Sequence, residues 1–401
     1  MRSSQRLLST AAILIGTTCA AFAAEQAEQP CEQPPVLSVA RLSQAARSAG
    51  LAVAQAEADV PAAARSNLPF VTADYHDPAL VHLRRQYELE KVVAAGEDEW
   101  SRQLLLKEWV HDRIPGGTPN VRVRTAHEIL EAAAKGEKFW CTFYAITYTE
   151  CALALGWQAR KIGVDRNHGP EGAGSTHHGV SEVWSNQFRK WVVIDPQSNL
   201  HFEKDGVPLS AWDIRAAWLK DQGKGVRHLV GIPPRAVHKN PAINWWKFPD
   251  EDETACYFWM YLSDHALGSE STSDVKLIFP QDEANNGLVW YQNNGERGQE
   301  HQGYRRKRFV PTERIEDVYW TVGLVEPRIA AAADGTLRLE LDSHCPNRTG
   351  YEVARNDGPW EALSGESVEW KPRSGANVLK LRTVSAGDVR GAIATLRLEV
   401  E

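Results

Sequence analysis

The sequence has few of the features that assign a protein to a functional class at once. Of its 401 residues only six are cysteine, 43% are hydrophobic and 24% are charged, which excludes a disordered chain and a disulfide-dense mini-scaffold. The formal net charge of −7 lacks the basic excess of a nucleic-acid-binding protein. Neither a phosphate-binding Walker loop nor a Gly-x-Ser-x-Gly motif occurs. We therefore expect a globular protein of two or three domains, with no nucleic-acid partner and no cofactor.

Long hydrophobic runs are also missing, with one short exception near the N-terminus. Arg2 and Arg6 precede the apolar run Leu7 to Ile15, and small residues follow around Ala23. This order is typical of a secretory signal peptide cut near Ala23, and the run is too short to span a bilayer. We therefore expect a secreted or periplasmic protein without a transmembrane segment.

Changes in composition divide the rest of the chain into four parts. Residues 24–67 contain few large apolar side chains and predict a flexible leader or a loosely packed helix. Residues 68–240 carry first helical and then strand-like periodicity, and residues 241–330 are aromatic and strand-like. Residues 331–401 alternate apolar and polar side chains between glycine-containing turns, which predicts a β-sandwich. The sequence thus predicts an α+β fold.

Four segments of the second part show helix signals. Helices are expected over 78–95 and 98–113, over a segment that begins at the capping box Thr125 to Glu128 and ends near Gly136, and over 141–155. Strands are expected over 180–184 and 191–194, joined by a polar turn.

Cys141 is the first candidate for chemistry, because it stands where a helix should begin. The unpaired N–H groups and the dipole of a helix N-terminus favour thiolate over thiol. On its own, a buried free cysteine is more often a small core residue. A nucleophile also needs a base and a group that orients the base.

The two predicted strands supply both groups. If Val183 pairs with Lys190, then His178 faces Asp195, and directly opposed side chains are close enough for an imidazole–carboxylate hydrogen bond. A register slip of one residue would bring His177 to that face instead. The strand pattern leaves both histidines open.

Several motifs in chain order resemble the transglutaminase-like superfamily of papain-like cysteine acyl transferases. The match covers residues 100–200, about a quarter of the chain, and includes upstream elements around Trp109 and Thr125. The motifs read Trp140-Cys141, Gly156-Trp-Gln-Ala-Arg160, His178-Gly-Val-Ser-Glu182-Val-Trp184 and Trp191-Val-Val-Ile-Asp195-Pro196.

This resemblance implies a fold and a set of roles. The fold would be a papain-like or transglutaminase-like core of helices on an antiparallel sheet, and the C-terminal sandwich would be immunoglobulin-like or fibronectin III-like. Cys141 would be the nucleophile, His178 the general base and Asp195 the residue that orients the histidine. Two positions depart from the family pattern, since Val180 replaces an aromatic residue and Trp140 replaces a glycine.

Further residues are candidates for the oxyanion site or the pocket wall. The Cys141 N–H is one expected oxyanion donor, and a second donor could come from Trp140, Trp109 or a loop. The remaining pocket candidates are His177, Glu182 and Gln197. For Glu182, a surface or cross-strand contact competes with a role in tuning the histidine. The loop 167–176 is expected to border the cleft.

Two other interpretations compete with a thiol enzyme. His168, His177, His178, His201 and Asp165 have metal-binding side chains, but their spacing matches no zinc signature. The tryptophans Trp245, Trp246 and Trp259 could form a glycan-binding platform, although aromatic side chains more often fill cores.

The sequence therefore predicts a secreted, cysteine-dependent amide hydrolase or acyl transferase acting on a protein or peptide, with a cell-wall peptide as one candidate substrate. The competing hypothesis is a non-catalytic scaffold that binds wall glycan or a protein partner. The oligomeric state is left open. Among Cys31, Cys151, Cys256 and Cys345 we expect at most one disulfide, because Cys151 should be buried and Cys141 should stay a free thiol.

Overall fold

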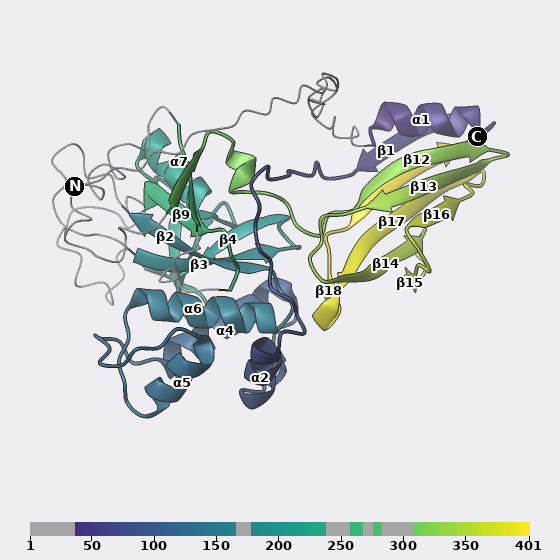
Figure 1. Ribbon diagram of the computed structural model, residues 1–401. Coiled ribbons are helices and arrows are strands. Elements are labelled where there is room, and N and C mark those ends of the chain that lie inside the picture. Colours follow the sequence, from purple (N-terminus) through teal and green to yellow (C-terminus); the bar gives the residue numbers. More distant parts are fainter. Residues whose placement is uncertain (1–36, 166–177, 238–256, 268–275, 283–307) are drawn as a thin grey trace, which may run out of the picture. The chain divides into compact units, whose positions relative to one another are not determined.

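The computed structural model describes residues 37–165, 178–237, 257–267, 276–282 and 308–401, all within one compact unit, Val36–Glu401. The unit is a mixed α+β structure, with helices and sheets in its N-terminal part and antiparallel sheets in its C-terminal part (Figure 1). The segment predicted to be a signal peptide and the loop 167–176 lie outside the described residues. No helix in the described ranges is long and apolar enough to cross a membrane.

The helices of the first part begin and end where their capping residues stand. They are α2 (Pro78–Gln86), α3 (Leu89–Val93), α4 (Glu99–Arg113), α5 (Ala126–Ala134), α6 (Cys141–Ala154) and α7 (Ala211–Asp221). Asp98 and Thr125 form reciprocal capping boxes at the starts of α4 and α5. The single helix expected over 78–95 is wrong, because Glu88 adopts a left-handed conformation (φ 47°) and separates α2 from α3.

The main sheet of this part has the strand order β11-β10-β9-β2-β3-β4. Its strands are β2 (Ala159–Asp165), β3 (His178–Ser185), β4 (Lys190–Ile194), β9 (Trp259–Ser263), β10 (Lys276–Pro280) and β11 (Arg308–Thr312). The pairs are antiparallel except β10 with β11, which run parallel. The boundary expected at residue 240 is therefore wrong, because three later strands extend the sheet that β2 to β4 begin.

Two hydrophobic clusters hold the main sheet between layers. Helices α2 and α4 to α6 cover one face, where Val183 and Val192 pack, and Figure 1 shows α4 and α6 running beneath β3. Val180 and Trp184 pack on the other face with α7 and residues 318–324. Trp259 is buried at 8% exposure, so it fills the core as the packing interpretation expected, while Trp245 and Trp246 lie outside the described residues.

A smaller sheet follows the main one, in the order β6-β5-β7-β8. Its strands are β5 (Leu200–Lys204), β6 (Val207–Pro208), β7 (Arg227–Val230) and β8 (Arg235–Val237). β5 follows β4 after a tight turn, because Asp195 and Leu200 exchange backbone hydrogen bonds of 2.9 Å each. We call residues 195–200 the Asp195 turn.

The C-terminal part contains two antiparallel sheets that share one hydrophobic cluster. One has the order β12-β13-β16, and the other has the order β1-β19-β17-β14-β15, with β18 paired to β17. Their later strands are β12 (Glu326–Ala333), β13 (Thr336–Asp342), β14 (Arg348–Arg355), β15 (Glu361–Ala362), β16 (Ser367–Trp370), β17 (Gly375–Ser385), β18 (Val389–Arg390) and β19 (Ala394–Val400). The predicted alternation is confirmed in β13 and β19, whose leucines are buried.

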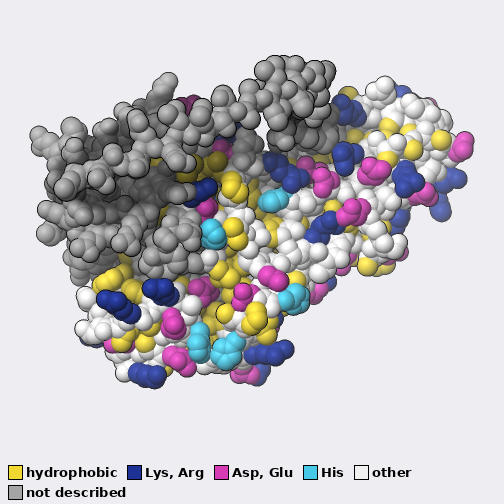
Figure 2. Space-filling model, viewed as in Figure 1, with side chains coloured by type: hydrophobic (Ala, Val, Ile, Leu, Met, Phe, Trp, Pro, Cys, Tyr) yellow, Lys and Arg dark blue, Asp and Glu magenta, His cyan; other side chains and the backbone are white. Residues whose placement is uncertain are grey.

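The outward positions of these strands are charged. On the face shown in Figure 2, positive and negative side chains are interspersed over the C-terminal sheets. In β13, for example, the exposed residues Arg338 and Glu340 alternate with buried leucines. This pattern keeps one side of each strand in water and the other in the core.

The leader expected over 24–67 is folded from Leu37 onward, which corrects that prediction. Its residues form α1 (Val39–Ser48) and β1 (Val53–Asp59). Leu37 and Leu42 are buried in the cluster of the C-terminal sheets. β1 pairs antiparallel with β19, from Val53 opposite Val400 to Asp59 opposite Thr395. Composition did not predict this strand, because most of its side chains are small or polar and all of them are partly or fully exposed to solvent.

Candidate active site

Cys141 opens α6, as the sequence predicted. Trp140 is the N-cap residue and supplies no side-chain cap, so the backbone N–H groups of the first turn have no such partner. The Cys141 side chain is a free thiol and is 8% exposed. Burial raises the pKa of this thiol, but hydrogen bonds from the His178 side chain and the Gly179 backbone N–H outweigh burial and lower its pKa overall.

His178 begins β3 and links the thiol to a carboxylate. Its Nε2 lies 2.8 Å from Asp195 Oδ2, and interaction with this histidine lowers the pKa of the Cys141 thiol. Burial lowers the pKa of His178, but the charge of Asp195 and the bonds to Asp195 and Cys141 raise it to about 10. These shifts favour a thiolate beside an imidazolium.

Asp195 is buried and keeps its charge. Burial raises its pKa, but the charge and hydrogen bond of His178 and the hydrogen bonds from Ser198 lower the pKa overall. The Ser198 backbone N–H donates to Asp195 Oδ1 at 3.2 Å, while Oδ2 stays on the histidine. The two carboxylate oxygens are thus both hydrogen-bonded.

The strand register differs from the expected one by two residues. Val183 pairs with Val192 rather than with Lys190, so Asp195 is not directly opposite His178. A shift of two residues keeps every side chain on its face, because side chains alternate with period two. The hydrogen bond between His178 and Asp195 therefore forms diagonally. His177 lies outside the described residues.

Gly179 lets α6 approach β3 closely. A Cβ on Gly179 would lie 3.0 Å from Thr142 Oγ1, 3.1 Å from Thr142 Cα and 3.2 Å from Thr142 N. Two of these atoms belong to the backbone of the first turn of α6, so that turn would have to move away. Gly179 was not among the predicted site residues, although a glycine beside a catalytic candidate signals such an approach.

We expect Gly179→Ala to slow alkylation of Cys141 by iodoacetamide at pH 7 at least severalfold, because the turn that carries the thiol would move away from His178. The added methyl group should also cost about 1–3 kcal/mol of unfolding free energy. Gly350→Ala is the control, since a Cβ there would have open space. Equal alkylation rates in both variants would show that the close approach is not needed.

Of the other pocket candidates, Trp140 lies beside the thiol and is 45% exposed. Gln197 lies in the Asp195 turn, and its backbone carbonyl accepts a hydrogen bond from His111 on α4. Trp109 points elsewhere: its ring contacts Tyr87 and Arg113, on the side of α4 away from the Asp195 turn. These contacts do not test the pocket role expected for Trp109, which stays a prediction.

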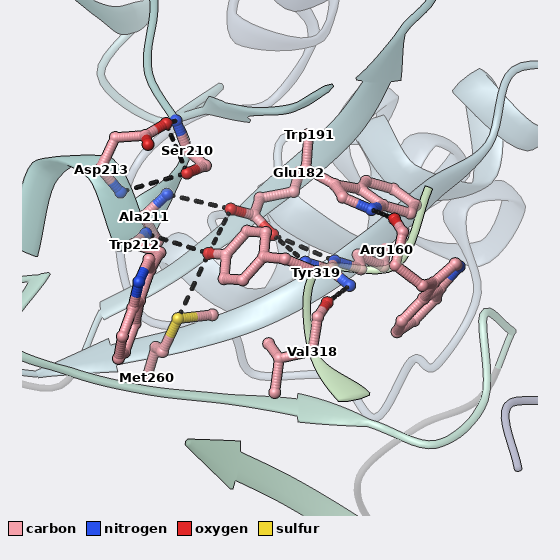
Figure 3. A network of polar contacts seen from close by, with 11 residues as sticks. Arg160, Glu182, Trp191, Ser210, Ala211, Trp212, Asp213, Met260, Val318 and Tyr319 are labelled. Carbon is pink, nitrogen blue, oxygen red and sulfur yellow. Dashed lines mark hydrogen bonds and ion pairs between the residues drawn. The ribbon is translucent and has the colours of Figure 1, made fainter. Parts of the chain in front are cut away.

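Glu182 is not a surface residue, and Figure 3 shows it in a network with Arg160 and Tyr319. It is fully buried, and Oε2 accepts hydrogen bonds from Arg160 Nη2 at 2.6 Å and Nε at 3.0 Å. Oε1 accepts from the Tyr319 hydroxyl at 2.9 Å and from the Ala211 N–H at 3.0 Å. Since Arg160 and Glu182 are paired across β2 and β3, the cross-strand alternative is the one observed.

The residues considered for a metal are dispersed, as far as the structure describes them. His178 bonds Asp195, while His201 contacts Lys107 and Glu203. In the described ranges no group of three His, Cys, Asp or Glu side chains is arranged to hold a metal ion. His168 lies outside those ranges.

Two further cysteines are described. Cys151 is fully buried, as expected, and burial raises its thiol pKa well above the usual value. Cys345 is also a free thiol, and burial raises its pKa as well. Of the described thiols, only that of Cys141 has a lowered pKa.

A comparison with protein-family models found no matching family, and a search of curated proteins found no match. The chemistry open to the site therefore follows from its geometry. A cysteine at a helix N-terminus, whose thiol pKa is lowered by a histidine that is itself hydrogen-bonded to a buried carboxylate, can form a nucleophilic ion pair.

Proposed function

We propose that the protein is a cysteine-dependent amide hydrolase or acyl transferase of the transglutaminase-like, papain-like type, acting on protein or peptide substrates outside the cytoplasm. The observation that carries the proposal is the buried His178–Asp195 hydrogen bond together with the lowered pKa of Cys141, which interaction with His178 helps to cause. The ordered sequence motifs around the same three residues support the same family.

The proposed reaction begins with thiolate attack on the carbonyl carbon of an amide. His178 holds the thiol proton and then gives it to the leaving nitrogen, so that ammonia or an amine departs and a thioester forms on Cys141. Water or a second amine then attacks the thioester, passes a proton to His178 and releases the thiol. Asp195 holds the imidazole ring and stabilises its charged form.

Backbone N–H groups at the start of α6 suit the developing oxyanion, because they point out of the helix end and carry its positive dipole. Trp140 stands at the rim with an exposed indole, which can form an apolar wall for a substrate. The C-terminal sheets fit the immunoglobulin-like or fibronectin III-like part of this proposal.

The alkylation of Cys141 tests the proposal. We expect iodoacetamide to modify Cys141 rapidly at pH 7 and the rate to fall on the acid side as the thiolate is protonated. Because the pKa of the thiol is lowered, the midpoint of that fall should lie below the ordinary pKa of a cysteine thiol. Labelling should be followed by peptide mapping, so that Cys31 and Cys256 are counted separately.

Cys141→Ala should remove the fast phase, whereas Cys345→Ala should leave it intact, since the pKa of the Cys345 thiol is raised. Equal labelling of wild type and Cys141→Ala would exclude an activated thiol and leave the binding scaffold as the better interpretation. A cysteine-reactive amide probe, followed by identification of the substrates cleaved or linked, would then define the substrate class.

A further inference from the structure

Helix α4 contacts the Asp195 turn through the side chains of its last two turns. Lys107, Glu108 and His111 point toward residues 196–201 and 232, and all three were unassigned by the sequence. The turn carries Asp195 at its first position, so its placement decides where the carboxylate points.

Lys107 makes the deepest of these contacts. It is fully buried, and its Nζ donates to the Asn199 carbonyl at 2.9 Å and lies 3.4 Å from His201 Nδ1. Burial lowers the pKa of His201, and its Nε2 lies 3.3 Å from Glu203 Oε1. A neutral ring with its proton on Nε2 leaves the Nδ1 lone pair to accept from the ammonium group.

The charge of Lys107 is costly at this position. Burial lowers the pKa of Lys107 to about 7, although the charges of Glu108 and Asp195 work in the opposite direction. An apolar side chain of similar volume would avoid this desolvation cost. We therefore expect Lys107 to stabilise the position of Asn199 and His201, which it contacts, and not only to fill space in the core.

Glu108 and His111 fix the two sides of the same turn. Glu108 Oε1 accepts from the Ile232 N–H at 3.1 Å and from Asn199 Nδ2 at 3.5 Å. His111 Nδ1 lies 3.0 Å from the Gln197 carbonyl and 3.2 Å from the Pro196 carbonyl. Both partners of this nitrogen are acceptors, so Nδ1 carries the hydrogen.

We infer that Lys107, together with His111, is a positioning residue for the proposed catalytic triad: it fixes the Asp195 turn so that Asp195 Oδ2 stays on His178 Nε2. This inference rests on the proposed function for its role in catalysis, but the contact itself can be tested without the thiol. The cation also offsets part of the negative charge of the buried Asp195.

The test compares Lys107→Met with Lys190→Met. Lys190 lies on β4 and pairs with Asp213, so the control removes a lysine from the strand that leads to Asp195 without touching the turn. In a Cys141→Ala background, the low-field proton resonance of His178 Nε2–H, assigned by its loss in His178→Gln, reports the bond to Asp195. We expect Lys107→Met to broaden or abolish this resonance and Lys190→Met to retain it.

In the protein that retains Cys141, Lys107→Met should shift the fall of the alkylation rate at acid pH to a pH higher by about one unit. This shift corresponds to an alkylation rate about tenfold lower at pH 6. His111→Ala, at a half-buried position, should give the same changes to a smaller degree. If circular dichroism shows that Lys107→Met does not fold, the same resonance measured in His111→Ala decides the test. An unchanged resonance in the folded variant overturns the inference. Slow alkylation in the wild type would instead contradict the proposed function, and the resonance would still report on Lys107.

Discussion

Arg160→Met is expected to lower the free energy of unfolding by about 3–5 kcal/mol, because it leaves the carboxylate of Glu182 buried without its cation. Arg160 is 1% exposed and donates two hydrogen bonds to Glu182 Oε2, and its guanidinium also donates to the Val318 carbonyl. Its Cζ lies 4.1 Å from the centre of the Trp191 ring (Figure 3). Urea unfolding with an unchanged m-value would measure the loss.

The matched control is Arg355→Met, which removes an arginine from an exposed pair with Glu361 across a strand pair of the C-terminal part. Exposed pairs contribute about 0–1 kcal/mol, so this variant should be nearly as stable as the wild type. The double variant Arg160→Met, Glu182→Gln should recover part of the loss, because the amide keeps an acceptor for Ala211 and Tyr319 without a bare charge. Equal losses of unfolding free energy in Arg160→Met and Arg355→Met would contradict the argument that burial makes the Arg160–Glu182 pair the more important one.

Deletion of residues 1–60 is expected to unfold the C-terminal sheets or to leave them insoluble. The deletion removes α1 and β1, and with them the fully buried Leu42 and a ladder that covers the edge of β19. Losing the two buried leucines of this segment alone costs about 3–6 kcal/mol, and an uncovered apolar edge strand favours aggregation. Thermal unfolding and light scattering would detect both effects.

Deletion of residues 1–36 is the corresponding control, since it ends before Leu37 and removes none of the buried side chains in question. This shorter deletion should leave the melting temperature close to that of the full chain. If the longer deletion melted at the same temperature as the shorter one, β1 would not be an integral strand of the sheet.

The site was predictable in outline because its three residues lie on elements with strong local signals. The helix start at Cys141 could be read from the sequence, and the resemblance chose His178 over His177, which the strand pattern had left open. Parity then kept His178 and Asp195 on one face despite the wrong register. The contacts of Lys107 and His111 could not be read, because they depend on how α4 packs on a turn some 90 residues later in the chain.

The fold was predicted least well where strands far apart in the chain meet. β1 has a weak apolar pattern and pairs only with β19, at the end of the chain. β9 pairs with β2 and β10 with β9, and no strand signal in the sequence points to these pairings. Glu182 illustrates the same limit: a charged residue in a strand predicts exposure, and only the packing of residues 318–320 against it buries the carboxylate.

The pairing of β1 with β19 sets an order for folding during synthesis. β1 leaves the ribosome early, but its hydrogen-bonding partners, Thr395 to Val400, are made last. At common synthesis rates β1 waits roughly tens of seconds, while the helices and the main sheet have time to form around Cys141. In a chain that emerges from its N-terminus, the thiol site can thus assemble while the C-terminal sheets are still incomplete, and β1 is open to pairing with other chains throughout that interval.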